Sequence, residues 1–244
     1  INSSATFSAA ENQTAVGTVS ASDAEGDSLT YSLSGTDASS FSINSSSGVI
    51  TFNSAPDYET KSSYSITVTA NDGTNTTNQS VTVSVTNVND NNPSITSDSS
   101  FSAAENQTAV GTASATDADG DTLTYSLSGT DASAFSINSS SGVITFDSAP
   151  DYETKSSYSV SVSVSDGSNS TSQSVTVSVT NVNDISPVIG SSATFSVAEN
   201  QTSVGTVTAS DAEGDSLTFS LSGTDASSFS INSSSGVITF NSAP

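Results

Sequence analysis

Several residue types that build common functional sites are missing from this chain of 244 residues: cysteine, histidine, tryptophan and methionine are all absent. Without cysteine, no disulfide framework can form. Without imidazole or thiolate, the chain lacks the ligands that zinc and copper prefer, and a nucleophilic serine has no histidine base. Lys61 and Lys155 are the remaining candidate bases, but they hold equivalent positions in a repeat and are interpreted as surface charges. The sequence therefore does not predict an enzyme.

Basic residues are almost absent as well, because these two lysines stand against 25 acidic residues and leave a net charge of −23. Such a chain is not expected to bind nucleic acid, and an anionic bilayer surface would repel it. It contains no apolar run of about 18 residues, so direct membrane insertion is not expected. Uncompensated charge opposes compaction, and divalent cations are therefore the expected partners. Bound metal would also supply the cross-links that disulfides provide in other small domains.

Repetition is the main positive feature of the sequence. Residues 11–90 recur almost unchanged 94 positions later, and the same sequence begins a third time before the chain ends. A repeat of this length can bury one core. Hydrophobic residues make up only 32% of the chain, but they recur at regular positions in every copy, which favours order over disorder. We predict three tandem domains, at 1–92, 93–186 and 187–244.

Within each copy the hydrophobic residues follow a period of two, as Tyr64, Ile66 and Val68 do between serines and threonines. Strand-forming residues fill these runs, and turn sequences such as the N-D-G at 71–73 separate them. The pattern predicts seven strands in the first copy, at 4–9, 15–22, 28–33, 39–44, 48–53, 62–70 and 79–88. Seven short strands in one such domain are typical of an immunoglobulin-like β-sandwich. The predicted fold is all-β, with seven-stranded Greek-key sandwiches joined end to end.

The third copy is the shortest of the three. It ends at Pro244, in register with Pro56 and Pro150, and lacks counterparts of the last two predicted strands. A sandwich without these strands cannot close and would expose sheet edges. Either the chain is a window from a longer repetitive protein, which we favour, or strands from a neighbouring chain complete this copy.

Acidic residues and asparagines gather where the copies meet. Glu11 ends the first predicted strand, Asp57 and Glu59 precede the sixth, and residues 87–91 form the connector after the seventh. In a sandwich of alternating strands, these segments share the outgoing pole of the first copy. The incoming pole of the second copy carries its own acids, among them Asp117, Asp119 and Asp166.

This placement predicts a junction at which acids of two domains meet with no base beside them. Like charges at close range are unfavourable unless they are protonated or bound to metal. Oxygen donors without imidazole or thiolate favour Ca²⁺, and the carboxylates outnumber those that Mg²⁺ usually recruits. A solvated acidic surface is the simpler alternative, but the strands are almost uncharged while the boundaries are acidic. A calcium site is the favoured interpretation.

Two other interpretations of these acids fail. Residues 117–121 begin like an EF-hand loop, but Thr122 occupies the position of the turn glycine and Ser128 that of the bidentate glutamate. A carboxylate pair such as Asp57 and Glu59 is also used in glycoside hydrolysis. That pair recurs in each complete copy, however, and no tryptophan platform accompanies it.

Four motifs follow one another in order along the complete copies: A-E-N-Q-T-A-V-G-T, D-A-D-G-D-x-L-x-Y-S-L, D-Y-E and N-V-N-D-N-N-P. Together they resemble the cadherin repeat, in cadherin order and over the full length of a copy. The near-identical copies are similar in particular to the cadherin-like repeats of very large bacterial surface or secreted adhesins.

The resemblance implies calcium ions between successive domains, commonly three to a junction. At the first junction it implies an outermost ion on Glu11, Asp57, Glu59 and Asp90, and a second ion on Glu11, Glu59, Asp90, Asp119, Asn87 and the Val88 carbonyl. A third ion would take Asp117, Asp119, Asp166, the Asn89 side chain and the carbonyls of Asn91 and about Asp121. The second junction would repeat the site with Glu105, Asp151, Glu153, Asn181, Asn183, Asp184, Asp211 and Glu213.

The chain departs from the cadherin pattern at several of these positions. Asn87 and Asn181 stand where the family usually has aspartate, which removes one charge from the middle ion. Glu213 replaces the second aspartate of a D-x-D pair, although a longer carboxylate can still reach the ion. The third copy has no counterpart of Asp166, so the third ion of the second junction is expected to be weak or missing. The tryptophan that classical cadherins exchange is also absent, and that adhesive mechanism is not carried over.

These observations predict a calcium-rigidified stalk or spacer of an extracellular adhesin or surface filament, at the cell surface or secreted. Its predicted partners are calcium ions and the neighbouring repeats of the same chain. Two alternatives stay open: the repeats bind carbohydrate or a like chain directly, or the third copy accepts strands and the chains assemble into a fibre.

Overall fold

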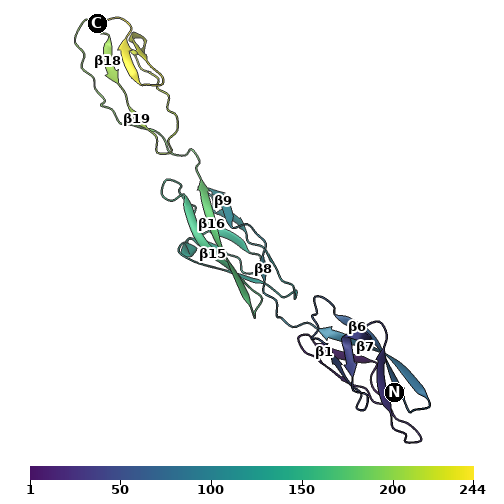
Figure 1. Ribbon diagram of the computed structural model, residues 1–244. Coiled ribbons are helices and arrows are strands. Elements are labelled where there is room, and N and C mark those ends of the chain that lie inside the picture. The colour runs from purple at the N-terminus through teal and green to yellow at the C-terminus, as the bar shows by residue number, and fades with distance from the viewer. The chain divides into compact units, whose positions relative to one another are not determined.

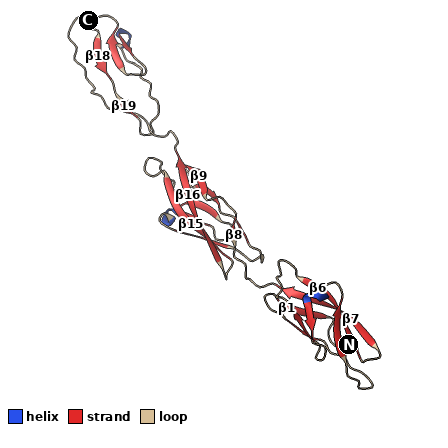
Figure 2. Cartoon of the chain, viewed as in Figure 1, coloured by secondary structure: helices blue, strands red, loops and turns tan.

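The computed structural model describes residues 1–244, and the chain is built from β-strands with three single-turn 3₁₀ helices (Figures 1 and 2). None of these helices has the length and apolar character needed to cross a membrane. The chain divides into two compact units. The first comprises Ile1–Thr96, Ser114–Tyr125 and Ser163–Ser172, and the second comprises Ser97–Ala113, Ser126–Val162 and Gln173–Pro244.

The first unit contains the whole first copy as a two-layered β-sandwich. One sheet has the strand order β1-β7-β6-β3 and the other the order β2-β5-β4. β1 runs parallel to β7, whereas β6 is antiparallel to both of its neighbours. The strands are β1 (Thr6–Ala10), β2 (Ala15–Thr18), β3 (Thr30–Ser34), β4 (Phe41–Ile43), β5 (Val49–Phe52), β6 (Ser63–Asn71) and β7 (Thr76–Thr86), with η1 at Ala38–Ser40. A short pair, β8 (Ser94–Ile95) with β11 (Ala115–Thr116), lies in the same unit. All seven predicted strands and the predicted sandwich are confirmed.

The core of the first copy lies between these two sheets and follows from the period of two. Ile66 and Val68 of β6 and Val83 of β7 are buried, and they face Ile50 of β5 across the sandwich. The serines and threonines between them point to solvent on the other face of the sheet. This arrangement explains how a chain with few hydrophobic residues still closes a core.

Gly48 is a turn position that only glycine fills without strain. Its φ of +71° lies in the left-handed region, and a Cβ there would stand 2.2 Å from the carbonyl oxygen of Val19. The same turn holds β5 in place, because the Gly48 carbonyl accepts a hydrogen bond from the Val19 N–H at 2.9 Å. Asn44 closes the turn from the other side by accepting hydrogen bonds from the N–H groups of Ser46 and Ser47.

The second copy repeats this topology. Its sheets have the orders β12-β15-β16-β9, with β9 parallel to β16, and β10-β14-β13. The bounds are β9 (Ser100–Ala104), β10 (Ala109–Thr112), β12 (Thr124–Ser128), η2 (Ala132–Ala134), β13 (Phe135–Ile137), β14 (Val143–Phe146), β15 (Ser157–Ser165) and β16 (Ser170–Thr180). A pair of short strands follows, β17 (Val188–Ile189) with β19 (Ala209–Ser210).

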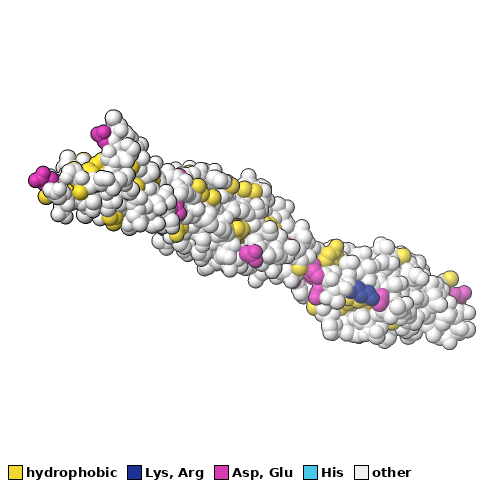
Figure 3. Space-filling model, turned by 90° about the horizontal axis from the view of Figure 1, so that it is seen from above, with side chains coloured by type: hydrophobic (Ala, Val, Ile, Leu, Met, Phe, Trp, Pro, Cys, Tyr) yellow, Lys and Arg dark blue, Asp and Glu magenta, His cyan; other side chains and the backbone are white.

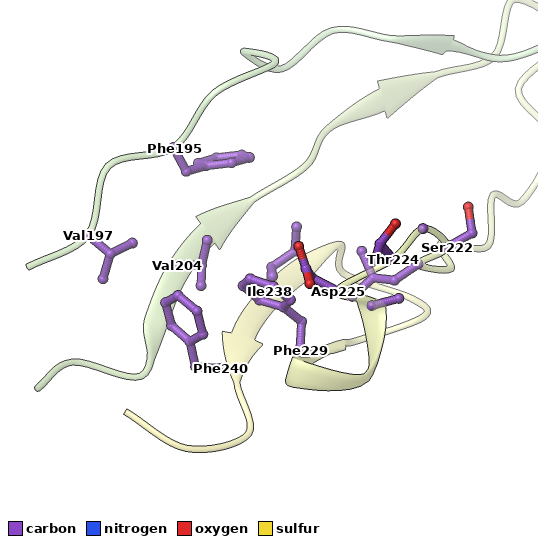
Figure 4. Close-up of a pocket in the computed structure, with 12 residues that line it drawn as sticks. Phe195, Val197, Val204, Ser222, Thr224, Asp225, Phe229, Ile238 and Phe240 are labelled. Carbon is purple, nitrogen blue, oxygen red and sulfur yellow. The ribbon is translucent and has the colours of Figure 1, made fainter. Parts of the chain in front are cut away.

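The third copy forms only one of the two sheets, β18-β21-β20, from β18 (Ser203–Thr206), η3 (Ala226–Ser228), β20 (Phe229–Ile231) and β21 (Val237–Phe240). Residues 194–198 and 218–222, the counterparts of β1 and β3, are not strands. In the first copy β1 pairs only with β7 and β3 only with β6, and the third copy has no counterpart of β6 or β7. The open face is an apolar cleft of about 500 Å³, lined among others by Phe195, Val204 and Ile238 (Figure 4). In this structure the third copy therefore has one sheet and an uncovered apolar face.

Candidate metal centres

Glu11 is the buried acid around which the first centre is built. It follows β1, and its side chain is only 2% exposed. Its Oε2 accepts a hydrogen bond from the N–H of Tyr58 at 2.8 Å, and its Oε1 accepts one from the N–H of Val88 at 2.7 Å. One carboxylate therefore joins the end of β1 to the D-Y-E turn and to the connector after β7. The two backbone N–H donors fix the position of this buried carboxylate.

Four carboxylates meet at this point. One oxygen each of Glu11, Glu59, Asp90 and Asp119 lies within 4.8 Å of the others. Burial raises the pKa of Glu59, and the charges of Glu11 and Asp119 add to the rise. A cation bound beside such a carboxylate would offset the repulsion that raises its pKa, as a proton otherwise does.

Asp119 connects this cluster to the second copy. Its Oδ2 accepts hydrogen bonds from the N–H groups of Asp90 at 3.1 Å and Asn91 at 2.8 Å, and its Oδ1 accepts one from the Asn91 side chain at 2.9 Å. The hydrogen bond from the Asn91 side chain is the main cause that lowers the pKa of Asp119. Asn87 also reaches this residue, because its amide donates to the Asp119 carbonyl at 2.8 Å. The connector is thus bonded to the loop that follows β11.

Asp119 also belongs to a second group of acids. Asp117, Asp119 and Asp121 each contribute an oxygen within 4.8 Å of the others. Asp166 lies in the loop after β15 and is 9% exposed. Asn89 reaches that loop, since its amide donates to the Asp166 carbonyl at 3.4 Å. The sequence placed these residues at one pole, and the structure brings them into the same unit.

Two buried oxygens in this second group have no hydrogen-bond partner: Oδ2 of Asp117 and Oδ2 of Asp166. The other oxygen of Asp166 accepts from the N–H groups of Ser168 at 2.7 Å and Asn169 at 2.6 Å. Burial acts to raise the pKa of Asp166, but these hydrogen bonds lower it overall, so the group is ionised at neutral pH. A buried, charged oxygen without a donor is unfavourable unless a cation binds it. The donor set therefore fits a metal ion.

The two boundaries use their D-Y-E aspartates differently. Asp57 accepts hydrogen bonds from the N–H and the hydroxyl of Thr60, and its oxygens are not among the clustered ones. Asp151, its counterpart, joins Glu105 and Glu153 within 4.8 Å. Burial raises the pKa of Glu153, and Glu105 adds to the rise.

The second boundary repeats the centre with fewer partners. Glu105 is 2% exposed and accepts from the N–H groups of Tyr152 at 2.9 Å and Val182 at 2.6 Å. It also lies within 4.8 Å of Asp184 and Glu213. Glu213 takes the place of Asp119, since its oxygens accept from the N–H of Asp184 at 2.6 Å and of Ile185 at 3.2 Å. The longer carboxylate thus reaches the connector, while its predicted contact with an ion stays a prediction.

The remaining residues of the second boundary form a further group. Asp211, Glu213 and Asp215 lie within 4.8 Å of one another, and Asn183 donates to Asp215. Asp215 is not among the site residues predicted from the sequence. The side chain of Asn181 makes no hydrogen bond, so the structure adds nothing to its predicted role.

Asn12 and Asn106 are further residues that the sequence analysis missed. Each follows the buried glutamate in a left-handed conformation, with φ of +60° and +62°. From there the amide of Asn12 donates to Asp90 and that of Asn106 to Asp184. The recurring A-E-N-Q-T sequence was a usable signal, because asparagine tolerates left-handed backbone better than most residues.

Lysine lies outside the acidic centres, because Lys61 pairs with Asp37 and Lys155 with Asp131. On the face shown in Figure 3, acidic side chains form separate groups, and most of the surface is neither charged nor hydrophobic. The centres therefore offer only carboxylate, amide and carbonyl oxygens. Such a donor set suits a hard cation of the Ca²⁺ type.

Comparison with known proteins agrees with this architecture. The model of the cadherin domain family matches residues 5–87 and 99–180. The crystal structure of mouse Cadherin-23 EC22-24 is 29% identical with a TM-score of 0.74, over 98% of this chain and 85% of that one. Mouse Protocadherin-24 EC1-3 is 26% identical with a TM-score of 0.72, over 99% and 84% of the two chains. Human CDH23 EC21-23, at 21% identity and a TM-score of 0.75 over 97% and 92%, supports the fold alone.

No curated protein sequence matches the chain significantly. The family match covers two of the three copies and more than half of the residues. The bacterial adhesins that the sequence resembles are not among the structures compared above, so that part of the resemblance stays a prediction. The chain belongs to the cadherin domain family.

Proposed function

We propose that this chain is a calcium-rigidified stalk or spacer of an extracellular adhesin or surface filament. Cadherin domains are adhesion and structural modules without enzymatic activity, and they generally bind Ca²⁺ where repeats meet. The chain carries acidic groups at both boundaries between its copies. We assign to these groups the calcium-binding role that acidic groups between repeats have in the family.

The residues named from the cadherin pattern are the proposed ligands. At the first boundary, Glu11, Asp57, Glu59, Asp90 and Asp119 would hold the outer ions, and Asp117, Asp119, Asp166 and Asn89 the inner one. When bound, Ca²⁺ supplies the positive charge that the lysines do not provide. The chain's own residues position the connector: Glu11 binds it at Val88, and Asp119 binds it at Asn91 from the second copy.

One observation carries the proposal most directly: Asp166 presents a buried oxygen without a partner in the loop that Asn89 contacts. An acidic surface that merely attracts water would leave its oxygens exposed. Here the oxygen is withdrawn from solvent and still ionised, as expected of a cation ligand.

The proposed location is the cell surface or the extracellular space. Extracellular calcium modules bind the ion with dissociation constants of about 10⁻⁴–10⁻³ M, which exceeds cytosolic calcium but not that of sea water or body fluid. The ions would therefore be bound outside the cell and released inside it. The proposed partners are calcium ions and neighbouring repeats of the same chain.

Calcium titration of the 244-residue chain tests the proposal. Isothermal titration calorimetry should show saturable binding in the range of about 10⁻⁴–10⁻³ M, with a rise in the thermal midpoint. Replacing Asp90 with alanine should weaken binding at the first boundary by about tenfold or more. Asp98→Ala is the matched control, since Asp98 is exposed and lies in no acidic group. Absence of binding, or equal effects of the two substitutions, would contradict the proposal.

Self-association is a second candidate function, which the apolar cleft of the third copy favours. In the first copy, the corresponding face is covered by Ile66, Val68, Val81 and Val83 of β6 and β7. Another chain that supplied such strands would cover the cleft in the same way. Light scattering over a range of concentrations tests this candidate, and a constant monomer mass would rule it out.

A further inference from the structure

We propose that the side chain of Asn91 holds the first boundary closed in the absence of metal, and that Ile185 leaves the second boundary dependent on metal. The two residues occupy the same position in the connector, in N-V-N-D-N-N-P and N-V-N-D-I-S-P. The inference rests on the proposed function only in that calcium is the alternative means of closure. It adds a difference between two boundaries that the cadherin pattern treats alike.

Asn91 bridges two carboxylates. Its Nδ2 lies 2.9 Å from Oδ1 of Asp90 and 2.9 Å from Oδ1 of Asp119. An amide NH₂ group has two hydrogens, so it can donate one to each carboxylate at the same time. A donor between two like charges offsets their repulsion, which is what a bound cation does in the same place.

The backbone of Asn91 is held as well. Its N–H donates to Oδ2 of Asp119 at 2.8 Å, beside the N–H of Asp90 at 3.1 Å. From the other side, the amide of Asn169 donates to the Asn91 carbonyl at 3.4 Å and to Oδ1 of Asn89 at 3.0 Å. These hydrogen bonds join the connector to two loops of the second copy, and none of their donors or acceptors is a metal ion.

Ile185 retains the backbone contact and loses the bridge. Its N–H donates to Glu213 at 3.2 Å, and the N–H of Asp184 donates to the same carboxylate at 2.6 Å. The isoleucine side chain has no donor, and it is 37% exposed. Asp184 and Glu213 therefore belong to one acidic group with no side-chain amide from residue 185 between them. The Asn106 amide donates to Asp184, as Asn12 does to Asp90, but it does not bridge the two carboxylates. Without metal, no side chain at position 185 offsets the repulsion between Asp184 and Glu213.

Swapping the side chains at positions 91 and 185 tests the inference. The variants Asn91→Ile and Ile185→Asn would be made in the full 244-residue chain and kept in excess EGTA. Hydrogen exchange then compares the amides of Asp90 and Asn91 with those of Asp184 and Ile185, and the connector peptides differ in sequence and can be told apart. In the unmodified chain the first pair should exchange about tenfold more slowly, since a hydrogen bond to a charged group is lost at the second.

The two substitutions should have opposite effects. Asn91→Ile should bring the exchange of residues 90 and 91 to the rate of residues 184 and 185, and Ile185→Asn should slow exchange at the second boundary. Asn92→Ile is the control, since Asn92 is an exposed neighbour whose side chain makes no hydrogen bond, and it should change nothing. The thermal midpoints of all variants would confirm that they are folded.

Equal exchange at the two boundaries, or no response to the swap, would overturn the inference. The measurement is made without metal, so its outcome does not depend on calcium binding. Calcium titration of the same variants tests the proposed calcium binding separately from the role of Asn91. If exchange differs as expected but no variant binds calcium, the proposed function fails and the role of Asn91 stands.

Discussion

At the scale of single residues, each of the two lysines is held by partners within its own copy. Lys61 Nζ lies 2.5 Å from Oδ1 of Asp37 and 4.6 Å from the centre of the Tyr64 ring. Lys155 repeats the arrangement, 2.5 Å from Asp131 and 4.5 Å from the Tyr158 ring. The lysines are thereby occupied at the sides of the sandwiches, and neither neutralises the acids at the boundaries.

The ion pair of Lys61 predicts a pH dependence of stability. The hydrogen bond from Lys61, followed by that from the Ser65 N–H, lowers the pKa of Asp37 below its usual value of 3.8. A carboxyl group whose pKa is lowered on folding stabilises the fold above its unfolded pKa, and this stabilisation is lost as the pH falls through the folded pKa. Lys61→Met should therefore lower the free energy of unfolding at pH 7 and have little effect below the folded pKa. Urea denaturation at several pH values tests this, and a difference that stays constant with pH would contradict it.

The role of some residues could be predicted from the sequence and that of others could not. Glu11, Asp90 and Asp119 were predicted from their place next to strands, because strand ends fix where a side chain emerges. The left-handed asparagine at position 12 recurs in every copy, so the sequence held a signal for it that was missed. The role of Asn91 depends on a bridge between two carboxylates, which a pattern of residue types does not show. The ion pair between Asp37 and Lys61 was not predicted from the sequence either.

At the scale of elements, an alternating sequence predicted a strand correctly wherever the strand that it pairs with is also present. The sequence T-F-S-L-S at 218–222 has the same alternation as β3, yet it is not a strand, because β3 pairs only with β6. The sheet β18-β21-β20 needs no such partner, and it forms in the third copy as in the other two. A strand is therefore a property of its neighbours as much as of its own sequence.

Turn glycines give a prediction at this scale. Gly48 and Gly26 both have positive φ, but a Cβ at Gly48 would meet the Val19 carbonyl at 2.2 Å, whereas nothing lies within 4 Å of one at Gly26. Gly26→Ala should cost about 1 kcal/mol of unfolding free energy, and Gly48→Ala about 3 kcal/mol. Chemical denaturation at constant calcium tests this. Equal losses would mean that the turn at Gly48 can shift away from Val19.

At the scale of the whole molecule, the chain concentrates its acidic groups at the copy boundaries. A net charge of −23 is distributed so that the strands are almost neutral and the boundaries are acidic. Each copy closes its own core, apart from the third, and each complete boundary depends on hydrogen bonds to a buried glutamate. In such an array, calcium would act on the joints and leave the sandwiches themselves unchanged.

Small-angle X-ray scattering of the 244-residue chain, with millimolar Ca²⁺ and then with excess EGTA, tests most directly whether shared ions stiffen the array. We predict that chelation shortens the mean end-to-end distance and broadens its distribution, and that the change is smaller in Ile185→Asn. Identical scattering profiles under the two conditions would contradict the account.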